Sequence, residues 1–348
     1  MRRLREVGLV VNPLDLALVA DIGGTNVRFA LAGGGAGELL VPGSIAQFTV
    51  AAFGSVVEAA REYLRGLGET PQRAVLAAAG PVAAGAVRIT NNPWVIDAGQ
   101  VRAALRLDAV RIVNDFAAMS AAIAQLRGES LRAIGAPPPP RIDYATPRVL
   151  GIIGPGTGLG VGVLVISDGR ALVLETEGGH VSFAPTTEEQ AAVQRLMAGR
   201  FGHVSNERLV SGAGLLNIYQ TLCTLRGRPA GAASPEAVSA AAAAGQDPQA
   251  VRAAEMFAEI LGAVAGDLVL TTGAWDGLYL AGGLVPPMLR WLERGGFRAH
   301  FENKGRFAAA VARVPTSAVM HEHAGLVGAA ALALDARLDT VRPSSGGT

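Results

Sequence analysis

Short apolar runs that end at glycine or polar residues recur through the first third of the chain. Residues 16–20, 74–79 and 110–113 have the length and composition of buried strands. Apolar residues return at 27–31, after a pair of glycines, so the first strand is predicted to turn back as a hairpin. A dinucleotide-binding fold would instead lead from this strand into a helix, and the pattern does not favour it.

Helical spacing of apolar positions separates these strands and dominates the middle of the chain. We expect helices over residues 51–67, 101–105 and 116 to about 126, and mostly helix over 186–265. Residues 149–167 repeat the strand, glycine turn, strand unit, which predicts two related α/β halves. The other predicted elements are a surface loop over 127–147, strands over 268–270 and 278–280, and a helix over 325–334.

Composition and charge restrict the class of protein. With 348 residues, 50% of them hydrophobic and 17% charged, the chain suits two domains with buried cores. A formal net charge of +1 provides no field that would gather nucleic acid or a membrane surface. The uncharged run over 149–167 is interrupted by repeated glycines and Pro155, so we expect no membrane span. The single cysteine, Cys223, and the absence of a signal peptide in residues 1–12 predict a cytoplasmic protein without disulfides or a cysteine-built zinc site.

Two glycine turns at strand ends are candidate phosphate-binding sites. Glycine leaves backbone N–H groups uncovered, and such groups can surround a phosphate. An ordinary hairpin turn would need the same glycines, but two such turns favour a phosphate clamp between two domains. Asp21, at the end of its strand, could orient Mg²⁺ through water. The candidate residues are Asp21, Gly23, Gly24, Thr25 and Asn26 in the first turn, and Gly156, Thr157 and Gly158 in the second.

Three further segments carry groups that suit a polyol. Asn114 and Asp115 follow an apolar strand, where a carboxylate can accept a hydroxyl proton, although the pair would also make a good helix N-cap. Glu177 and His180 flank two glycines and could bond adjacent hydroxyls, or could belong to an exposed turn. Glu207 could complete the ring of hydroxyl acceptors, or could be an exposed charge near a helix start.

Gly282 and Gly283 follow the apolar residues 278–280. They could let an adenine ring lie against bare backbone, or could form a close strand-to-helix packing turn. Taken with the two phosphate turns and the polyol-binding groups, this order of motifs predicts an enzyme that moves a phosphoryl group from ATP to a sugar.

These motifs resemble those of the bacterial-type glucokinases, which are ATP-dependent kinases of the sugar kinase, Hsp70 and actin superfamily. The resemblance covers about residues 16–335. It implies an α/β protein of two RNase H-like domains, of the actin and hexokinase type, flanking a central cleft. The segments that carry it are Asp21-Ile22-Gly23-Gly24-Thr25-Asn26, Thr90-Asn91-Asn92-Pro93-Trp94, Ile112-Val113-Asn114-Asp115-Phe116, Gly156-Thr157-Gly158-Leu159-Gly160, Glu177-Gly178-Gly179-His180, Glu207-Arg208-Leu209-Val210-Ser211-Gly212 and Ala281-Gly282-Gly283.

The resemblance also implies domain boundaries and chemistry. A small domain would comprise residues 16–125 and 321–340, and a large domain 126–320, with 1–15 as an extension and 341–348 as a flexible tail. The reaction would be transfer from Mg-ATP to the 6-hydroxyl of D-glucose, the entry step of glycolysis, in a homodimer. Mg²⁺ would be held mainly by ATP phosphates and water. The implied roles are Asp115 as the base, Asn91, Asn114, Glu177, His180 and Glu207 as further sugar-binding residues, the two glycine turns as phosphate sites, and Gly282 and Gly283 beside adenosine.

Several rival functions stay open from the sequence alone. The acceptor could be another hexose, such as mannose or an amino sugar, because the geometry that selects hydroxyls is not readable from sequence. The donor could be polyphosphate in place of ATP. A catalytically silent sugar sensor is disfavoured because residues 1–15 are too short for a helix-turn-helix and Asp115 is present.

Overall fold

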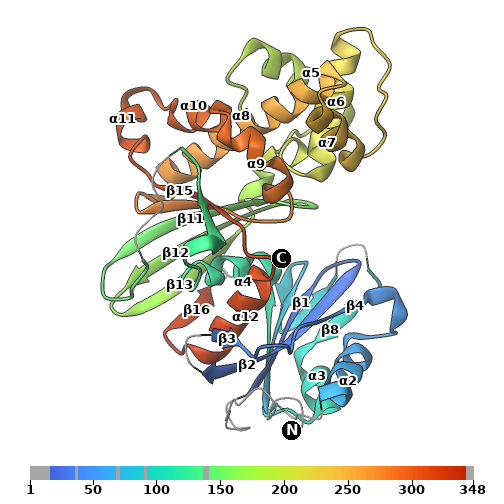
Figure 1. Ribbon diagram of the computed structural model, residues 1–348, viewed down its shortest axis with the longest axis vertical. Helices are drawn as coiled ribbons and strands as arrows, with labels where there is room; N and C mark the ends of the chain where they lie inside the picture. The colour runs from blue at the N-terminus through green and yellow to red at the C-terminus, as the bar shows by residue number, and fades with distance from the viewer. Residues whose placement is uncertain (1–15, 36–37, 68–70, 90–91, 136–140, 342–348) are drawn as a thin grey trace.

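A computed structural model describes residues 16–35, 38–67, 71–89, 92–135 and 141–341. Two β-sheets lie one above the other, with helices α4 and α12 between them and most of the remaining helices on the far side of the second sheet (Figure 1). None of the helices in the described ranges combines the length and hydropathy needed to cross a bilayer. The extension 1–15, Asn91 and most of the tail predicted from residue 341 onward lie outside the described residues.

The first sheet has the order β3-β2-β1-β5-β9, with β4 paired to β2. Its strands are β1 (Ala17–Ile22), β2 (Asn26–Gly35), β3 (Glu38–Leu40), β4 (Ala46–Thr49), β5 (Arg73–Ala78) and β9 (Ala109–Asn114). The antiparallel β1–β2 pair confirms the predicted hairpin. Strands β1, β5 and β9 run parallel with Ile22, Ala78 and Asn114 in register, so their carboxyl ends meet at one edge.

Both faces of the first sheet are buried, because its residues alternate between two apolar clusters. Along β1, Ala17 and Val19 face the cluster that holds α4 and α12, whereas Leu18 and Ala20 face the opposite cluster. Helices α2 (Val56–Leu67) and α3 (Ala98–Leu105) contribute to that opposite cluster. A small three-stranded sheet beside them contains β6 (Val82–Ala83), β7 (Ala86–Arg88) and β8 (Val95–Asp97).

The second sheet has the order β10-β15-β14-β11-β12-β13-β16. Its strands are β10 (Leu131–Ala133), β11 (Arg148–Pro155), β12 (Leu159–Ser167), β13 (Arg170–Thr176), β14 (Gly277–Leu280), β15 (Thr316–Val319) and β16 (Leu338–Val341). The antiparallel pairing of β11 with β12 confirms the second predicted hairpin. Along β12, Val161 and Val163 face the helical layer, and Leu164 and Ile166 face the cluster that holds α4 and α12.

The helical layer packs on one face of the second sheet (Figure 1). It includes residues 186–265, which were predicted to be mostly helix. Hydrogen-bonding N-caps start several of these helices: Thr187 for α5, Ser211 for α6, Ser234 for α7 and Asp247 for α8. The helices are α5 (Glu188–Phe201), α6 (Gly212–Leu225), α7 (Pro235–Ala244), α8 (Pro248–Thr272), α9 (Val285–Glu293), α10 (Gly296–Glu302) and α11 (Ala308–Val311).

Four predicted elements need correction. Residues 268–270 belong to α8 and not to a strand, because a short apolar run has the same pattern in a buried strand and a buried helix. The helix expected over 51–67 begins at Val56, and the one expected to reach about 126 ends at Ala122. The expected loop over 127–147 contains β10, which pairs with β15 at the sheet edge. The pattern analysis also did not anticipate β13 and β16.

Helices α4 (Asp115–Ala122) and α12 (Ala324–Leu334) cross closely between the sheets. Their contact depends on small residues: the backbone of Gly328 lies against the Ala118 carbonyl, and a side chain there would overlap that oxygen. Within the residues 321–340 assigned to the small domain, α12 packs on β1, β2 and β5, whereas β16 pairs with β13 of the second sheet. The domain division itself stays a prediction.

Gly328→Ala should destabilise the protein by roughly 1–3 kcal/mol, the usual cost of forcing a methyl group into a filled core. The added methyl overlaps backbone, which cannot move aside as a flexible side chain can. Chemical denaturation would measure the loss. Gly199→Ala is the matched control, because this exposed helix position has open space and should gain up to about 1 kcal/mol. Equal stabilities of the two variants would contradict the prediction.

Candidate functional site

The first glycine turn joins β1 to β2 at the edge where the parallel strands end. The turn is closed by Gly23 N–H donating to the Asn26 carbonyl at 2.9 Å. Asn92 donates its side-chain Nδ2 to the Gly24 carbonyl at 3.2 Å, and the Thr25 carbonyl accepts from Val50 N–H at 2.9 Å. Hydrogen bonds from two other segments, at Asn92 and Val50, therefore hold the predicted phosphate turn in place. Thr25 remains exposed.

Asp21 lies at the end of β1, against the start of α12. A Cβ built on Gly325 would lie 3.0 Å from Asp21 Oδ2, so only a residue without a side chain lets the helix begin this close to the carboxylate. Arg28 Nη1 lies 3.8 Å from the same oxygen. Burial raises the pKa of Asp21, and the positive charge of Arg28 partly opposes that rise.

Asn114 and Asp115 form the junction between β9 and α4. Asn114 Oδ1 accepts from Phe116 N–H at 2.9 Å and Ala117 N–H at 3.2 Å, so the capping role considered for it is confirmed. Asp115 Oδ1 also accepts from Phe116 N–H, at 2.8 Å. Burial and the negative charge of Asp21 raise the pKa of Asp115 to about 6, which is suitable for a group that takes up a proton near neutral pH.

The second glycine turn, between β11 and β12, is closed by Gly156 N–H donating to the Gly158 carbonyl at 2.9 Å. The Gly156 carbonyl in turn accepts from Gly212 N–H at 2.9 Å, where α6 begins. Glu207 Oε2 accepts from Leu159 N–H at 3.0 Å and lies so close to Gly158 that a Cβ there would be 2.5 Å from it. The Glu207 carboxylate, which was predicted to bind the sugar, is therefore hydrogen-bonded to the backbone of this turn.

Two short 3₁₀ turns bring the remaining sugar candidates beside this hairpin. Glu177 precedes η4 (Gly178–His180), and Glu207 lies in η5 (Asn206–Arg208). Asn206 N–H donates to the Val181 carbonyl at 2.9 Å and joins the two turns. The His180 ring lies 4.0 Å from the Glu177 carboxylate, with both side chains largely exposed. Both side chains therefore lie at the protein surface rather than in the core.

Gly282 and Gly283 lie at the end of β14, next to the same hairpin. Gly282 has a φ of +96°, and a Cβ there would lie 2.7 Å from the Pro155 carbonyl, so glycine is required on both counts. Leu284 N–H also donates to that carbonyl, at 3.1 Å. The packing-turn interpretation is confirmed for Gly282, and Gly283 remains exposed beside it.

The described residues place the candidates in two groups, one at the end of the first sheet and one around the second glycine turn. Asp21 and Asp115 interact electrostatically, and the second turn carries Glu207 on its backbone. Asn91 lies outside the described residues, next to Asn92. Three contributors were not anticipated: Asn92 on the first turn, the Phe116 ring on the second hairpin, and His203, whose Nε2 lies 3.0 Å from the His180 carbonyl. Because these contacts join distant segments, only spatial proximity reveals them.

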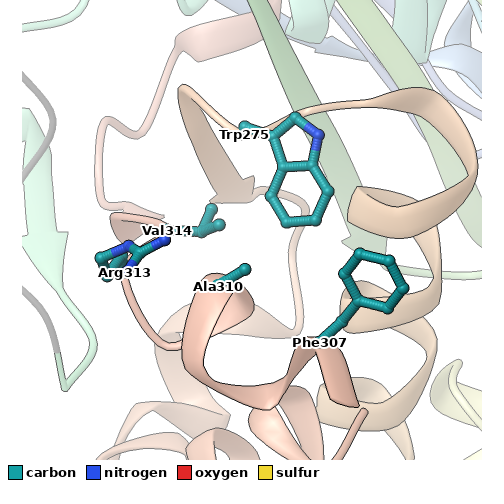
Figure 2. A pocket seen from close by; sticks show the side chains of 5 residues that line it. All are labelled: Trp275, Phe307, Ala310, Arg313 and Val314. Atoms are coloured by element: carbon teal, nitrogen blue, oxygen red, sulfur yellow. The ribbon is translucent and has the colours of Figure 1, made fainter. Parts of the chain in front are cut away.

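Two surface cavities lie outside this group. One, with a volume of about 280 Å³, lies between the end of α8 and α11 (Figure 2). The other, of about 360 Å³, adjoins His203 and Ser182 behind the η4 turn. None of the predicted site residues lines either cavity. The first is lined by Trp275, Phe307, Ala310, Arg313 and Val314.

Comparisons with known proteins agree with this arrangement. The family model described as Glucokinase matches residues 18–336. A glucokinase of Stenotrophomonas maltophilia (strain R551-3) is 49% identical over 322 residues, covering 92% of this chain and 96% of the relative. The crystal structure of a glucokinase from an Antarctic psychrotroph is 33% identical, with a TM-score of 0.82 over 91% of this chain and 98% of that one.

More distant structures share the fold. A glucokinase from Balamuthia mandrillaris, solved in complex with glucose, is 19% identical, with a TM-score of 0.79 over 95% of this chain and 98% of that one. The predicted class, two α/β domains of the actin and hexokinase type, is confirmed. The family model spans both glycine turns, Asp115, the sugar candidates and the Gly282 turn, and the 49% identical relative covers 92% of the chain, so the chain belongs to the glucokinase family.

Proposed function

We propose that this ATP-dependent hexose kinase transfers the γ-phosphoryl group of Mg-ATP to the 6-hydroxyl of D-glucose, giving glucose 6-phosphate and ADP. The observation that carries the proposal is Asp115, a half-buried carboxylate of raised pKa that directly precedes Phe116, whose ring lies against the hairpin of the Gly156–Gly158 turn. The glucokinase name of the 49% identical relative and the glucose complex of the Balamuthia mandrillaris enzyme support glucose as the acceptor.

Each group has a role that its position supports. The glucose 6-oxygen attacks the γ-phosphorus while the bond to the bridging oxygen of ADP breaks, and the hydroxyl proton passes to Asp115. Glu177, His180 and Glu207 bond the other hydroxyls and orient the sugar. The two glycine turns bind the phosphates through backbone N–H groups, and the Gly282–Gly283 turn borders adenosine. Asn114, which caps α4, contributes a further sugar contact.

The residues present fit a magnesium ion that accompanies ATP. Asp21 and Asp115 are close enough for the charge of one to raise the pKa of the other, and oxygen donors of this kind suit Mg²⁺. We propose that phosphate oxygens and water hold the ion, with Asp21 as the carboxylate that faces it. When bound, it supplies positive charge that offsets the charge of the phosphates.

A coupled assay of purified protein with Mg-ATP and a panel of hexoses tests the proposal. Formation of glucose 6-phosphate and ADP, with much slower turnover of mannose, fructose and amino sugars, is the expected result. Faster turnover of another hexose would reassign the substrate, and turnover with polyphosphate alone would reassign the donor. Glucose binding without any turnover would support the silent sensor and refute the kinase reaction.

The pH dependence of kcat/KM for glucose should show an acid limb near pH 6. Asp115 has a pKa of about 6, so below this pH it is increasingly protonated and cannot accept the hydroxyl proton. The value of kcat/KM, which reports groups of the free enzyme, should then fall about tenfold per pH unit. A profile that stays flat to pH 5, as an ordinary carboxyl of pKa 3.8 would allow, contradicts this role.

We further propose that the enzyme is a cytoplasmic homodimer. The family resemblance supports the dimer, and a single buried, unpaired Cys223 is compatible with a reducing compartment. Light scattering on the purified protein tests the dimer directly.

A further inference from the structure

The aromatic ring of Phe116 lies across the hairpin that carries the second glycine turn. Gly154 and Gly160 are directly paired on β11 and β12, and both face this ring. A Cβ built on Gly154 would overlap ring atom Cε2 and lie 3.0 Å from Cζ. A Cβ on Gly160 would overlap Cγ and Cδ2 and lie 2.8 Å from Cδ1. The two glycines therefore form the contact site of the ring, which we call the seat, and a side chain at either position would overlap the ring.

Backbone conformation does not explain these glycines. Gly154 and Gly160 are absent from the residues with positive φ, so an L-residue could adopt either conformation. Gly154 has a second reason to lack a side chain, since the Ala281 carbonyl would lie 2.8 Å from its Cβ. For Gly160 the three nearest atoms all belong to Phe116. The ring is thus the contact that requires glycine at position 160.

Phe116 is also tied to the candidate base. Its N–H donates to both Asn114 Oδ1 and Asp115 Oδ1, and its carbonyl accepts from Ser120 Oγ at 2.8 Å. The backbone of Phe116 therefore belongs to the start of α4, while its ring rests on the hairpin of the other sheet. Phe116 therefore links the end of β9, where Asp115 lies, to the hairpin whose turn is proposed to bind phosphate.

We propose that Phe116 is a positioning residue: its ring, seated on Gly154 and Gly160, sets the separation between Asp115 and the Gly156–Gly158 turn. This inference rests on the proposed function, because it assumes that Asp115 acts on the acceptor hydroxyl. A misplacement of about 1 Å can cost on the order of 100-fold in rate, so a loose or displaced ring should lower kcat more than it weakens binding.

A double-mutant cycle tests the seat. Gly160→Ala forces the ring away, and kcat should fall roughly 10–100-fold while KM for glucose and for ATP changes less than about threefold. Phe116→Ala removes every ring atom that the new methyl overlaps. In the Phe116→Ala background, the Gly160→Ala change should therefore cost almost nothing. If Gly160→Ala lowers kcat as much in the Phe116→Ala background as in the wild type, the proposal is overturned. An effect of Gly160→Ala on KM alone would also overturn it.

Gly151→Ala is the matched control. It lies on the same strand as Gly154, but its Cβ would meet the side chains of Leu278, Ala274 and Leu268 instead of Phe116. Its kcat should stay near that of the wild type even if its melting temperature falls. A kcat loss as large as that of Gly160→Ala would show a general hairpin effect and refute the seat.

Two further comparisons make the outcome decisive. If Gly160→Ala does not fold, the series Phe116→Leu and Phe116→Ala replaces it: kcat should fall in that order at steady KM, and unchanged kcat in both would overturn the proposal. Asp115→Asn is measured in parallel. Near-normal turnover in Asp115→Asn would refute the base role itself. If Asp115→Asn is inactive but the effects of Phe116→Ala and Gly160→Ala on kcat are additive, only the role of Phe116 is refuted.

Discussion

Asp115→Asn should lower kcat by roughly 10²–10⁴-fold, the usual contribution of a positioned general base. The substitution keeps the side-chain oxygen that accepts from Phe116 N–H, so the start of α4 should stay intact. What is lost is the ability to take the hydroxyl proton. Glucose affinity should change far less than kcat, because the other hydroxyl-binding groups remain. Steady-state kinetics together with calorimetric titration of glucose separates the two effects.

Two controls accompany this measurement. Asp115→Ala should lose at least as much turnover, since it removes both the base and its backbone hydrogen bond. Asp108→Asn changes an exposed carboxyl just before β9 and should leave kcat near the wild-type value. Turnover of Asp115→Asn within about threefold of the wild type would be incompatible with proton transfer to this residue.

Glu207→Gln should raise KM for glucose by roughly 10–100-fold, because a hydrogen bond to a charged group is worth about 1.5–3 kcal/mol. The glutamine oxygen can still accept from Leu159 N–H, so the second glycine turn should keep its shape. The KM for ATP should therefore change less than about threefold. Glu177→Gln, just before the other 3₁₀ turn, should likewise raise KM for glucose far more than KM for ATP.

Glu207→Ala distinguishes the two functions of this carboxylate. It removes the sugar contact and also frees Leu159 N–H, so KM should rise for ATP as well as for glucose. Glu188→Gln, an exposed carboxyl in the first turn of α5, is the control and should change neither constant. An equal rise of both constants in Glu207→Gln would argue against a direct sugar contact.

The candidate site could be proposed from sequence because its residues sit in local motifs. Most motifs combine a strand end with glycine or an acidic residue, whereas Glu207 lies in a 3₁₀ turn between two helices. The hairpins at β1–β2 and β11–β12 formed as the pattern predicted. Asn114 shows the limit of such reasoning. The sequence suggests a helix cap for Asn114, and the family resemblance implies a sugar contact. The structure confirms the cap, and the sugar contact stays a proposal.

The pattern failed where one apolar sequence suits two structures. Residues 268–270 are apolar in either a buried strand or a buried helix, and packing within the helical layer decided for α8. Edge strands such as β10 and β16 were also missed, because three or four residues give too short a repeat to recognise. Their formation depends on pairing with β15 and β13, which are distant in sequence.

The sequence by itself determined the motifs, their order and two related α/β halves, because each depends on local spacing of apolar, glycine and acidic residues. The actin- and hexokinase-type fold was implied by the resemblance of these motifs to those of a known family. Only the tertiary structure decided that parallel register places Ile22, Ala78 and Asn114 at one edge, with Asp21 beside Asp115. It also decided that Gly160 serves the ring of Phe116. The raised pKa of Asp115 has the same origin, since burial and a neighbouring charge arise only when distant segments pack together.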